Sequence, residues 1–376
     1  MELKTKSFLA GLAVLIGSAI GAGVLGIPYV ASKAGFLVGV GYILLIGSII
    51  FVVNLYLGEI ILRTKGKHQL GGYAAKYLGK KGRFFMNFAI AFLVYAAIVA
   101  YTFGIAESFS FLFFGDSSYS ILIGVVFAMF MSTLLWRGLK ALKRFEKWGV
   151  GIVLVLLGLI IILFAGKISF DNLVGFNSNY LFLPFGVVLF SLLSVTAIPE
   201  VNLVLKKDKK LMKKILILGS LIPIIFYILF AFVVVGFKGG STPEIATLTL
   251  GPVFVVLGIL AMFTSYLALG NALLDNFIYD YKYSKKKSWF LTAIIPIFLF
   301  LIIKMFSFFS FTKILSIGGV VSGGIIAVLV LLMIGKAKKK GDRKPEYKIP
   351  VNWFVIGLLS LIFLLGVVRE IFVALN

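Results

Sequence analysis

Long apolar runs separated by short polar connections extend over the whole chain. About twenty consecutive apolar residues in an α-helix are enough to cross the ~30 Å hydrocarbon layer of a bilayer. The longest polar stretches, 63–83 and 336–349, are the size of loops, so we expect one transmembrane domain over residues 1–376. The pattern predicts an all-α polytopic membrane protein with eleven transmembrane helices, at residues 7–29, 38–62, 84–113, 120–136, 150–165, 181–204, 212–236, 249–279, 288–304, 312–335 and 351–374.

The placement of basic residues predicts how these helices are oriented. The formal charge is +23, and 31 of the 37 lysines and arginines fall on one side of the membrane if the N-terminus is cytoplasmic. Cytoplasmic loops are the ones that carry an excess of lysine and arginine. We therefore expect a multi-pass plasma-membrane protein with a cytoplasmic N-terminus and an outside C-terminus. The basic loops are topology signals and contacts for anionic lipid, and no nucleic-acid partner is expected.

Composition argues against catalytic chemistry. The chain contains no cysteine, which excludes disulfides and thiolate metal sites, and its single histidine, His68, lies in a basic loop. A membrane-embedded enzyme would need clusters of histidines or paired carboxylates, and none occur. No cofactor is expected.

The run at 7–29 contains a segment that would form a poor continuous helix. Four glycines, at positions 17, 21, 23 and 26, are followed by Pro28. Glycine inside a helix costs about 1 kcal/mol relative to alanine, and proline about 3 kcal/mol. One explanation is close packing of small residues against a neighbouring helix. The other is an unwound segment that faces protein or a water-filled cavity within the membrane.

A second interruption, in the run at 181–204, favours unwinding. Hydroxyl side chains precede Pro199, and in both runs the proline follows the suspected opening by five residues. The two runs are five spans apart and cross the membrane in opposite directions. Paired broken helices of this kind are typical of transporters with a site at the membrane midplane. They predict a five-plus-five inverted repeat with broken helices 1 and 6, made of repeat one at about 7–166, repeat two at about 181–335 and an additional helix at about 351–374.

Broken helices can bind a zwitterion without charged side chains. The N-terminal end of a half-helix offers unpaired N–H groups to a carboxylate, and the C-terminal end of the preceding half offers carbonyls to an ammonium group. We expect the amides of Ala22 and Gly23 to hold the carboxylate, because glycine lets a ligand approach the backbone closely. The predicted substrate site comprises Ser18, Ala19, Gly21, Ala22, Gly23, Tyr101, Phe190, Ser191, Ser194 and Thr196.

A coupling cation could bind beside this site. The hydroxyls of Thr264 and Ser265, with the carbonyls of Gly17 and Ile20, would form an oxygen cage suited to Na+. The alternative is that these hydroxyls bond back to carbonyls one turn earlier in their own helix.

Other polar groups in the spans have two interpretations. Tyr101 could donate to a bound carboxylate, whereas for Tyr95 we favour a structural bond to a neighbouring helix. Intramembrane acids are candidates for proton relays. Glu59 has Arg63 one turn further on and Glu107 lies near the outer end of its span, so structural roles are favoured for both.

Several segments together resemble one family. Residues 17–28 followed by Ala34-Gly35-Phe36 resemble the first helix of the tryptophan/tyrosine (hydroxy/aromatic amino acid) permease family, one of the amino acid/auxin permeases within the amino acid–polyamine–organocation superfamily. Matches to its third, sixth, seventh and eighth helices occur at residues 100–101, 198–208, 219–227 and 264–275. The resemblance implies an eleven-helix, LeuT-type inverted repeat that moves amino acids by alternating access, usually driven by protons. It also implies that the residues named above line the substrate and cation sites.

One departure limits what the resemblance implies. The aromatic- and histidine-bearing segment of the family's sixth helix is replaced here by Leu192-Leu193-Ser194-Val195-Thr196, so aromatic preference is not carried over. Thr264-Ser265 resembles the hydroxyl pair of sodium-coupled relatives, which leaves H+ and Na+ both open.

The leading hypothesis is a secondary active transporter that imports amino acids by cation-coupled symport. A passive channel or uniporter for small solutes is one alternative, although repeated identical helices or rings of charge, typical of channels, are absent. A membrane-embedded enzyme is the other.

Overall fold

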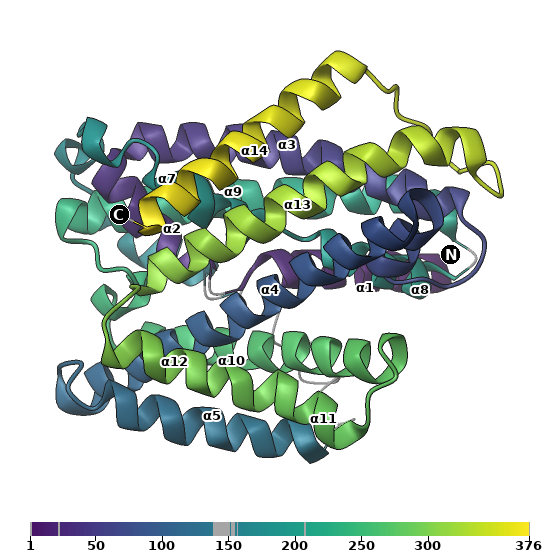
Figure 1. The fold of residues 1–376 in the computed structure, drawn as a ribbon. Helices are drawn as coiled ribbons and strands as arrows, with labels where there is room; N and C mark the ends of the chain where they lie inside the picture. The colour runs from purple at the N-terminus through teal and green to yellow at the C-terminus, as the bar shows by residue number, and fades with distance from the viewer. Residues whose placement is uncertain are drawn as a thin grey trace.

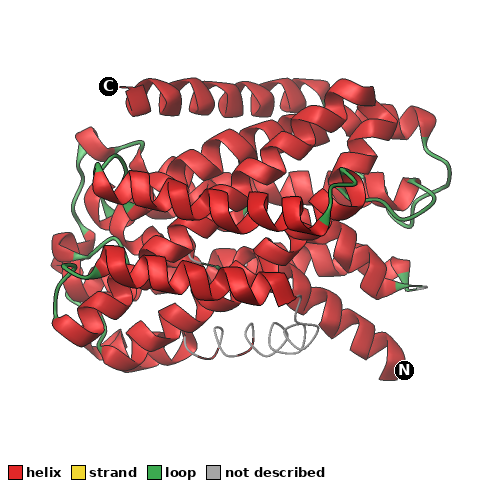
Figure 2. Ribbon diagram, turned by 60° about the horizontal axis from the view of Figure 1, so that its bottom comes forward, coloured by secondary structure: helices red, strands yellow, loops and turns green. Residues whose placement is uncertain are grey.

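The computed structural model describes residues 2–21, 23–137, 157–206 and 208–375, together with residues 151 and 155. Helices joined by loops make up this part of the chain, and no strand occurs in it (Figure 2). The predicted span at 150–165 lies partly outside the described residues. Only its second half is seen, as the short apolar helix Leu157–Lys167.

The α-helices follow the predicted runs closely. In chain order they are α1 (Glu2–Ala19), α2 (Gly23–Ala34), α3 (Phe36–Arg63), α4 (Leu70–Phe114), α5 (Ser120–Arg137), α7 (Leu183–Leu192), α8 (Ile198–Leu205), α9 (Met212–Lys238), α10 (Pro252–Asp275), α11 (Lys285–Trp289), α12 (Ile295–Met305), α13 (Phe311–Lys340) and α14 (Trp353–Leu375). Short 3-10 turns, among them η4 (Val195–Ala197), and two π-helical turns link several of them.

Eight helical segments of the described chain are long and apolar enough to cross a membrane. The pair α1 and α2, bent by 49° at its break, makes a ninth when it is counted as one span. The protein is therefore a polytopic membrane protein, and the predicted count of eleven is not confirmed. Exposed side chains agree with a lipid environment, because Leu122, Ile162, Phe298 and Leu365 are each more than half exposed.

The prediction of a loop over 63–83 is wrong from Leu70 onward. α4 begins at Leu70 and turns sharply at Gly79, whose φ of 78° suits glycine. Leu70, Tyr73 and Tyr77 recur at helical spacing and are buried, so this first part of α4 is an amphipathic helix. The length of apolar runs did not predict this helix, because Gly71, Gly72 and Lys76 leave no long apolar run in it.

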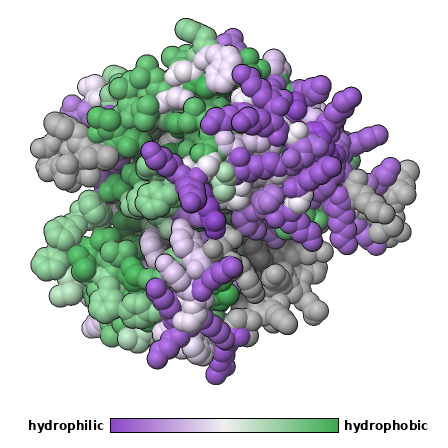
Figure 3. Space-filling view, turned by 45° about the vertical axis from the view of Figure 1, so that its right-hand side comes forward, coloured by the Kyte–Doolittle hydropathy of each residue, from purple (hydrophilic) through white to green (hydrophobic). Residues whose placement is uncertain are grey.

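The two interrupted helices lie antiparallel in the middle of the bundle. α1 packs against α8 near the end that carries the N-terminus, and α2 packs against α7 near the opposite end, where the C-terminus lies (Figure 1). α13 packs against both α4 and α7, and so encloses the interrupted pair from one side. Hydrophilic side chains gather over the N-terminal end, and apolar ones cover most of the rest of this face (Figure 3).

Candidate functional site

Both predicted interruptions are present. α1 ends at Ala19 and α2 begins at Gly23, while α7 ends at Leu192 and α8 begins at Ile198 after η4. At the first break the amide of Gly21 donates to the Ala19 carbonyl over 3.2 Å, which is a turn tighter than an α-helix. Ala22, predicted to hold a carboxylate, lies outside the described residues.

The two breaks touch each other at Gly23 and Ser191. A Cβ on Gly23 would lie 2.3 Å from Ser191 Oγ and 2.8 Å from Ser191 Cα. Only glycine allows this approach, because any side chain would collide with the backbone of α7. Ser191 Oγ itself donates to the Val187 carbonyl over 2.7 Å. A ligand at the breaks would therefore lie beside this contact, and not between the two residues.

A tyrosine from α9 joins the ends of α1 and α7. The Tyr227 hydroxyl lies 2.5 Å from the Ala19 carbonyl oxygen and 3.0 Å from the Ser191 carbonyl oxygen. Tyr227 is completely buried, so its single proton is shared between two carbonyls freed by the unwinding. These are two of the carbonyls predicted to face an ammonium group. The Ser191 carbonyl oxygen has a second lone pair for another donor, whereas the Ala19 carbonyl already accepts from the Gly21 amide as well.

Two other helices reach the first break. A Cβ on Gly21 would lie 2.9 Å from the Tyr101 hydroxyl of α4 and 3.7 Å from Ser265 Oγ of α10. The structure thus brings together two residues of the predicted substrate site, Gly21 and Tyr101, and one predicted cation ligand, Ser265. The neighbouring Thr264 donates to the carbonyls of Leu260 and Ala261 in its own helix, over 3.1 and 3.0 Å.

The second break is held by an amide from α3. Asn54 Nδ2 donates to Ser194 Oγ and to Ser220 Oγ, over 3.1 Å in both cases, and the Asn54 side chain is completely buried. Its Oδ1 accepts no hydrogen bond from the described residues. The group borders a cavity of about 10 Å³, the size of one water-sized sphere, next to Ala19 and Gly219.

The other predicted substrate residues differ in how deeply they are buried. Ser194 is buried, Thr196 is partly buried in η4, and Ser18 is exposed on α1. Phe190 is buried against α13, where a Cβ on Gly319 would lie 2.6 Å from its backbone nitrogen. Of the other predicted cation ligands, Ile20 is buried at the break, directly after α1, and Gly17 lies within the last turn of α1.

The remaining polar groups have structural partners. Tyr95 donates to the Leu291 carbonyl over 2.9 Å, which confirms the structural interpretation. Glu59 is fully buried and forms an ion pair with Arg63 at 2.8 Å. Glu107 is ion-paired with Lys304 of α12. Within the described residues no group of three or more histidines, cysteines or acids could hold a metal ion.

The sequence predicted no role for Asn54, Ser220 or Tyr227. A signal for Asn54 was present, since an amide in an otherwise apolar span must face protein. The partners of all three residues come from helices far apart in the chain, so their roles follow only from the packing.

Comparison with known proteins identifies the family. The model of the tryptophan/tyrosine permease family matches residues 4–242. The chain belongs to this family. Its relatives include glutamine transporter 2 of Aliivibrio fischeri, 26% identical over 229 residues that make up 59% of each chain. Tyrosine-specific transport system 1 of Haemophilus influenzae is 26% identical over 227 residues, 57% of this chain and 54% of that one. The chain thus spans somewhat more than half the length of these two relatives.

A further relative and a solved structure match nearly the whole permease. The tryptophan-specific transport protein of Haemophilus influenzae is 22% identical over an alignment covering 99% of this chain and 97% of its own. The crystal structure of MhsT in complex with L-phenylalanine superposes with a TM-score of 0.68, covering 97% of this chain and 98% of that one at 17% identity. At that identity the likeness concerns the fold, which is the LeuT fold.

Proposed function

We propose that this permease is a secondary active transporter that imports amino acids by cation-coupled symport with alternating access. The observation that carries the proposal is the pair of antiparallel broken helices, whose freed carbonyls meet at the Tyr227 hydroxyl. The names of the relatives support an amino acid as the substrate, because they contain glutamine, tyrosine and tryptophan. Each relative is also named as a transporter, a transport system or a transport protein. That naming also favours transport over a membrane-embedded enzyme.

In this proposal the substrate carboxylate binds the N-terminal turn of α2 and the adjoining residues 21–23. The first N–H groups of a helix have no partner within it and carry a partial positive charge. The Tyr101 hydroxyl, which lies next to Gly21, donates to the same carboxylate. The ammonium group faces the Ser191 carbonyl, which keeps one lone pair beside Tyr227, whereas the Ala19 carbonyl already accepts from Gly21 and Tyr227.

The coupling cation in this proposal binds between α1 and α10. Ser265 is the favoured hydroxyl ligand, because it lies next to the first break. Thr264, Gly17 and Ile20 complete the set, since a hydroxyl that donates its proton to a carbonyl still has lone pairs for Na+. The buried acid Glu59 is ion-paired with Arg63, which favours Na+ over a proton relay through this side chain.

The proposed topology places the N-terminus in the cytoplasm and the C-terminus outside, as the distribution of basic residues predicts. Repeat one would cover residues 7–166 and repeat two 181–335, with α14 as the additional helix. The antiparallel packing of α1–α2 against α7–α8 supports this division.

Uptake into proteoliposomes tests the proposal. The purified protein is reconstituted and offered a panel of labelled amino acids under an inward Na+ gradient, an inward H+ gradient, or neither. We expect accumulation of at least one amino acid that depends on one of the gradients. Equal uptake with and without a gradient would instead indicate a uniporter or channel, and no uptake of any amino acid would reject the proposal.

A further inference from the structure

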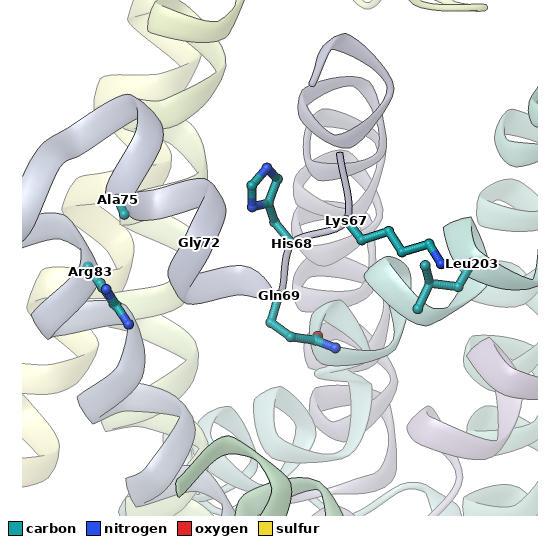
Figure 4. A pocket seen from close by; sticks show the side chains of 7 residues that line it. All are labelled: Lys67, His68, Gln69, Gly72, Ala75, Arg83 and Leu203. Atoms are coloured by element: carbon teal, nitrogen blue, oxygen red, sulfur yellow. The ribbon is translucent and has the colours of Figure 1, made fainter. Parts of the chain in front are cut away.

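A hollow lies away from the helix breaks, where α3 passes into α4. Its volume is about 290 Å³. It is bordered by the connection between the two helices, by the first part of α4 and by the end of α8 (Figure 4). Its main lining residues are Lys67, His68, Gln69, Gly72, Arg83 and Leu203.

The lining of this pocket is basic and contains no carboxylate. Lys67 extends toward Leu203 of α8, and Arg83 lies on the opposite side of the hollow (Figure 4). In the described part of the chain Lys67 forms no ion pair. Cations on two opposite walls suit a ligand that carries negative charge and lies between them.

The nearby carboxylate of Asp342 already has an ion-pair and a hydrogen-bond partner within the protein. It pairs with Lys76 of α4 and accepts from the Lys65 amide over 2.9 Å. The hydrogen bond from Lys76 holds the pKa of the Asp342 carboxyl below its usual value, so this acid is ionised at neutral pH. The positive charge of Lys76 is therefore balanced within the protein, whereas that of Lys67 is not.

The N-terminus of a helix lies beside the same hollow. α4 begins at Leu70, and Gln69 at its N-cap makes no side-chain capping bond. The amides of Gly72 and Tyr73 donate to the Gln69 carbonyl, over 2.9 and 3.1 Å, so what attracts an anion here is the partial positive charge of the helix N-terminus. A Cβ on Gly72 would lie 3.0 Å from the Cβ of His68, so the missing side chain keeps the hollow open. The His68 ring is held edge-on to Tyr73, at 5.4 Å between ring centres.

The hollow lies next to exposed apolar side chains. Directly after Arg83, Phe84 and Phe85 are 65% and 49% exposed, as lipid-facing residues would be. Arg83 thus marks the boundary between the basic end of the bundle and its apolar surface. A ligand here would contact the connection between α3 and α4 and the second half of a broken helix, α8, at once.

We propose that this pocket binds the phosphate group of an anionic ligand, with Lys67 and Arg83 as charge partners and the positive end of the α4 dipole adding to the attraction. Anionic phospholipid headgroups and soluble phosphate share this chemistry. The volume exceeds what a phosphate group needs, and the adjoining phenylalanines offer a surface for acyl chains. Both features favour a phospholipid as the source.

The absence of cysteine in the chain allows a direct binding test. Ala75 lines the pocket, and Lys80 is exposed on the same helix without lining it. Single Ala75→Cys and Lys80→Cys variants in detergent are labelled with a maleimide in the presence of short-chain phosphatidylglycerol, short-chain phosphatidylcholine or inorganic phosphate. We expect phosphatidylglycerol at ten times its Kd to slow labelling of Ala75→Cys about tenfold, because only the unoccupied fraction reacts. Labelling of Lys80→Cys should be unchanged.

Charge variants in the Ala75→Cys background identify the binding residues. Lys67→Gln and Arg83→Gln should each raise the apparent Kd about fivefold, whereas Lys81→Gln, on the exposed face of α4, should leave it unchanged. Protection by inorganic phosphate but not by phosphatidylglycerol would assign the site to a soluble anion. The proposal is overturned if neither probe slows labelling of Ala75→Cys. It is also overturned if Lys81→Gln weakens protection as much as Lys67→Gln does. That result would mean that the general positive charge of the surface attracts the ligand, and not the pocket. Uptake is not the readout, so this test is independent of the transport assay.

Discussion

The two breaks differ in geometry and in the residues that build them: α1 and α2 are bent by 49°, whereas α7 and α8 are joined by η4 within one span, Leu183–Leu205. The break between α1 and α2 is rich in glycine, and other helices approach its bare backbone through Tyr101 and Ser265. The break between α7 and α8 carries hydroxyl side chains and is held by Asn54 of α3. The first break is thus open to contact at its backbone, whereas the second is fixed by side-chain hydrogen bonds.

This difference assigns ligand binding to the first break and the fixing of a half-helix to the second. A ligand can reach backbone donors and carbonyls only where side chains are absent, which is the situation at Gly21. A half-helix can keep a fixed position in the membrane only if its freed polar groups have partners, which Asn54 and Tyr227 provide. We therefore expect changes at the first break to alter ligand and cation binding, and changes around the second to alter stability.

The largest effect is expected from Gly23→Val, which acts where the two breaks touch. Its Cβ would lie 2.8 Å from Ser191 Cα, and overpacking of this kind costs about 1–3 kcal/mol of folding free energy. We expect uptake to be abolished and the melting temperature to fall. Gly41→Val in α3 is the matched control, because a Cβ there has no heavy atom within 4 Å. Equal uptake by the two variants would contradict the contact between the breaks.

Tyr227→Phe should have the next largest effect. Its hydroxyl serves two buried carbonyls, and leaving buried polar groups unpaired costs about 1–3 kcal/mol. The free energy of unfolding should fall by that amount, and uptake should fall with it. Tyr266→Phe provides the comparison, since the buried Tyr266 hydroxyl has no hydrogen-bond partner among the described residues. If both variants unfold alike, Tyr227 does not bridge the two helices.

A smaller effect is expected at the proposed cation site. Ser265→Ala should raise the Na+ concentration for half-maximal uptake about tenfold, which corresponds to about 1.4 kcal/mol. Thr264→Ala should change it less, because the Thr264 hydroxyl already bonds within its own helix. Uptake measured over a series of Na+ concentrations distinguishes the two. An unchanged Na+ dependence in Ser265→Ala would remove this residue from the site.

The smallest effect is expected from Ser194→Ala at the second break. Asn54 would lose one of its two acceptors, at a cost of about 1 kcal/mol in unfolding free energy, while half-maximal substrate and Na+ concentrations stay unchanged. Ser178→Ala, at an exposed position, should leave stability as it is. A large loss of substrate affinity in Ser194→Ala would show that the second break also contacts the ligand.

The helical class, the two breaks and the membrane location could be predicted from the chain alone. Apolar run length, glycine content and proline position are local properties, and each acts on the segment that carries it. The first part of α4 was not predicted because it is short, and Gly71, Gly72 and Lys76 leave no long apolar run in it. Asn54 and Tyr227 could be marked as buried polar groups, but their partners could not be named.

By itself, the sequence determined where helices form, where two of them open, and which end of the bundle is basic. Only the tertiary structure decided that Gly23 contacts Ser191, that Tyr227 bridges Ala19 and Ser191, and that Ser265, unlike Thr264, is directed toward the first break. The physical reason is that unwinding frees backbone groups locally, whereas the groups that satisfy them come from helices up to 208 residues away in the chain.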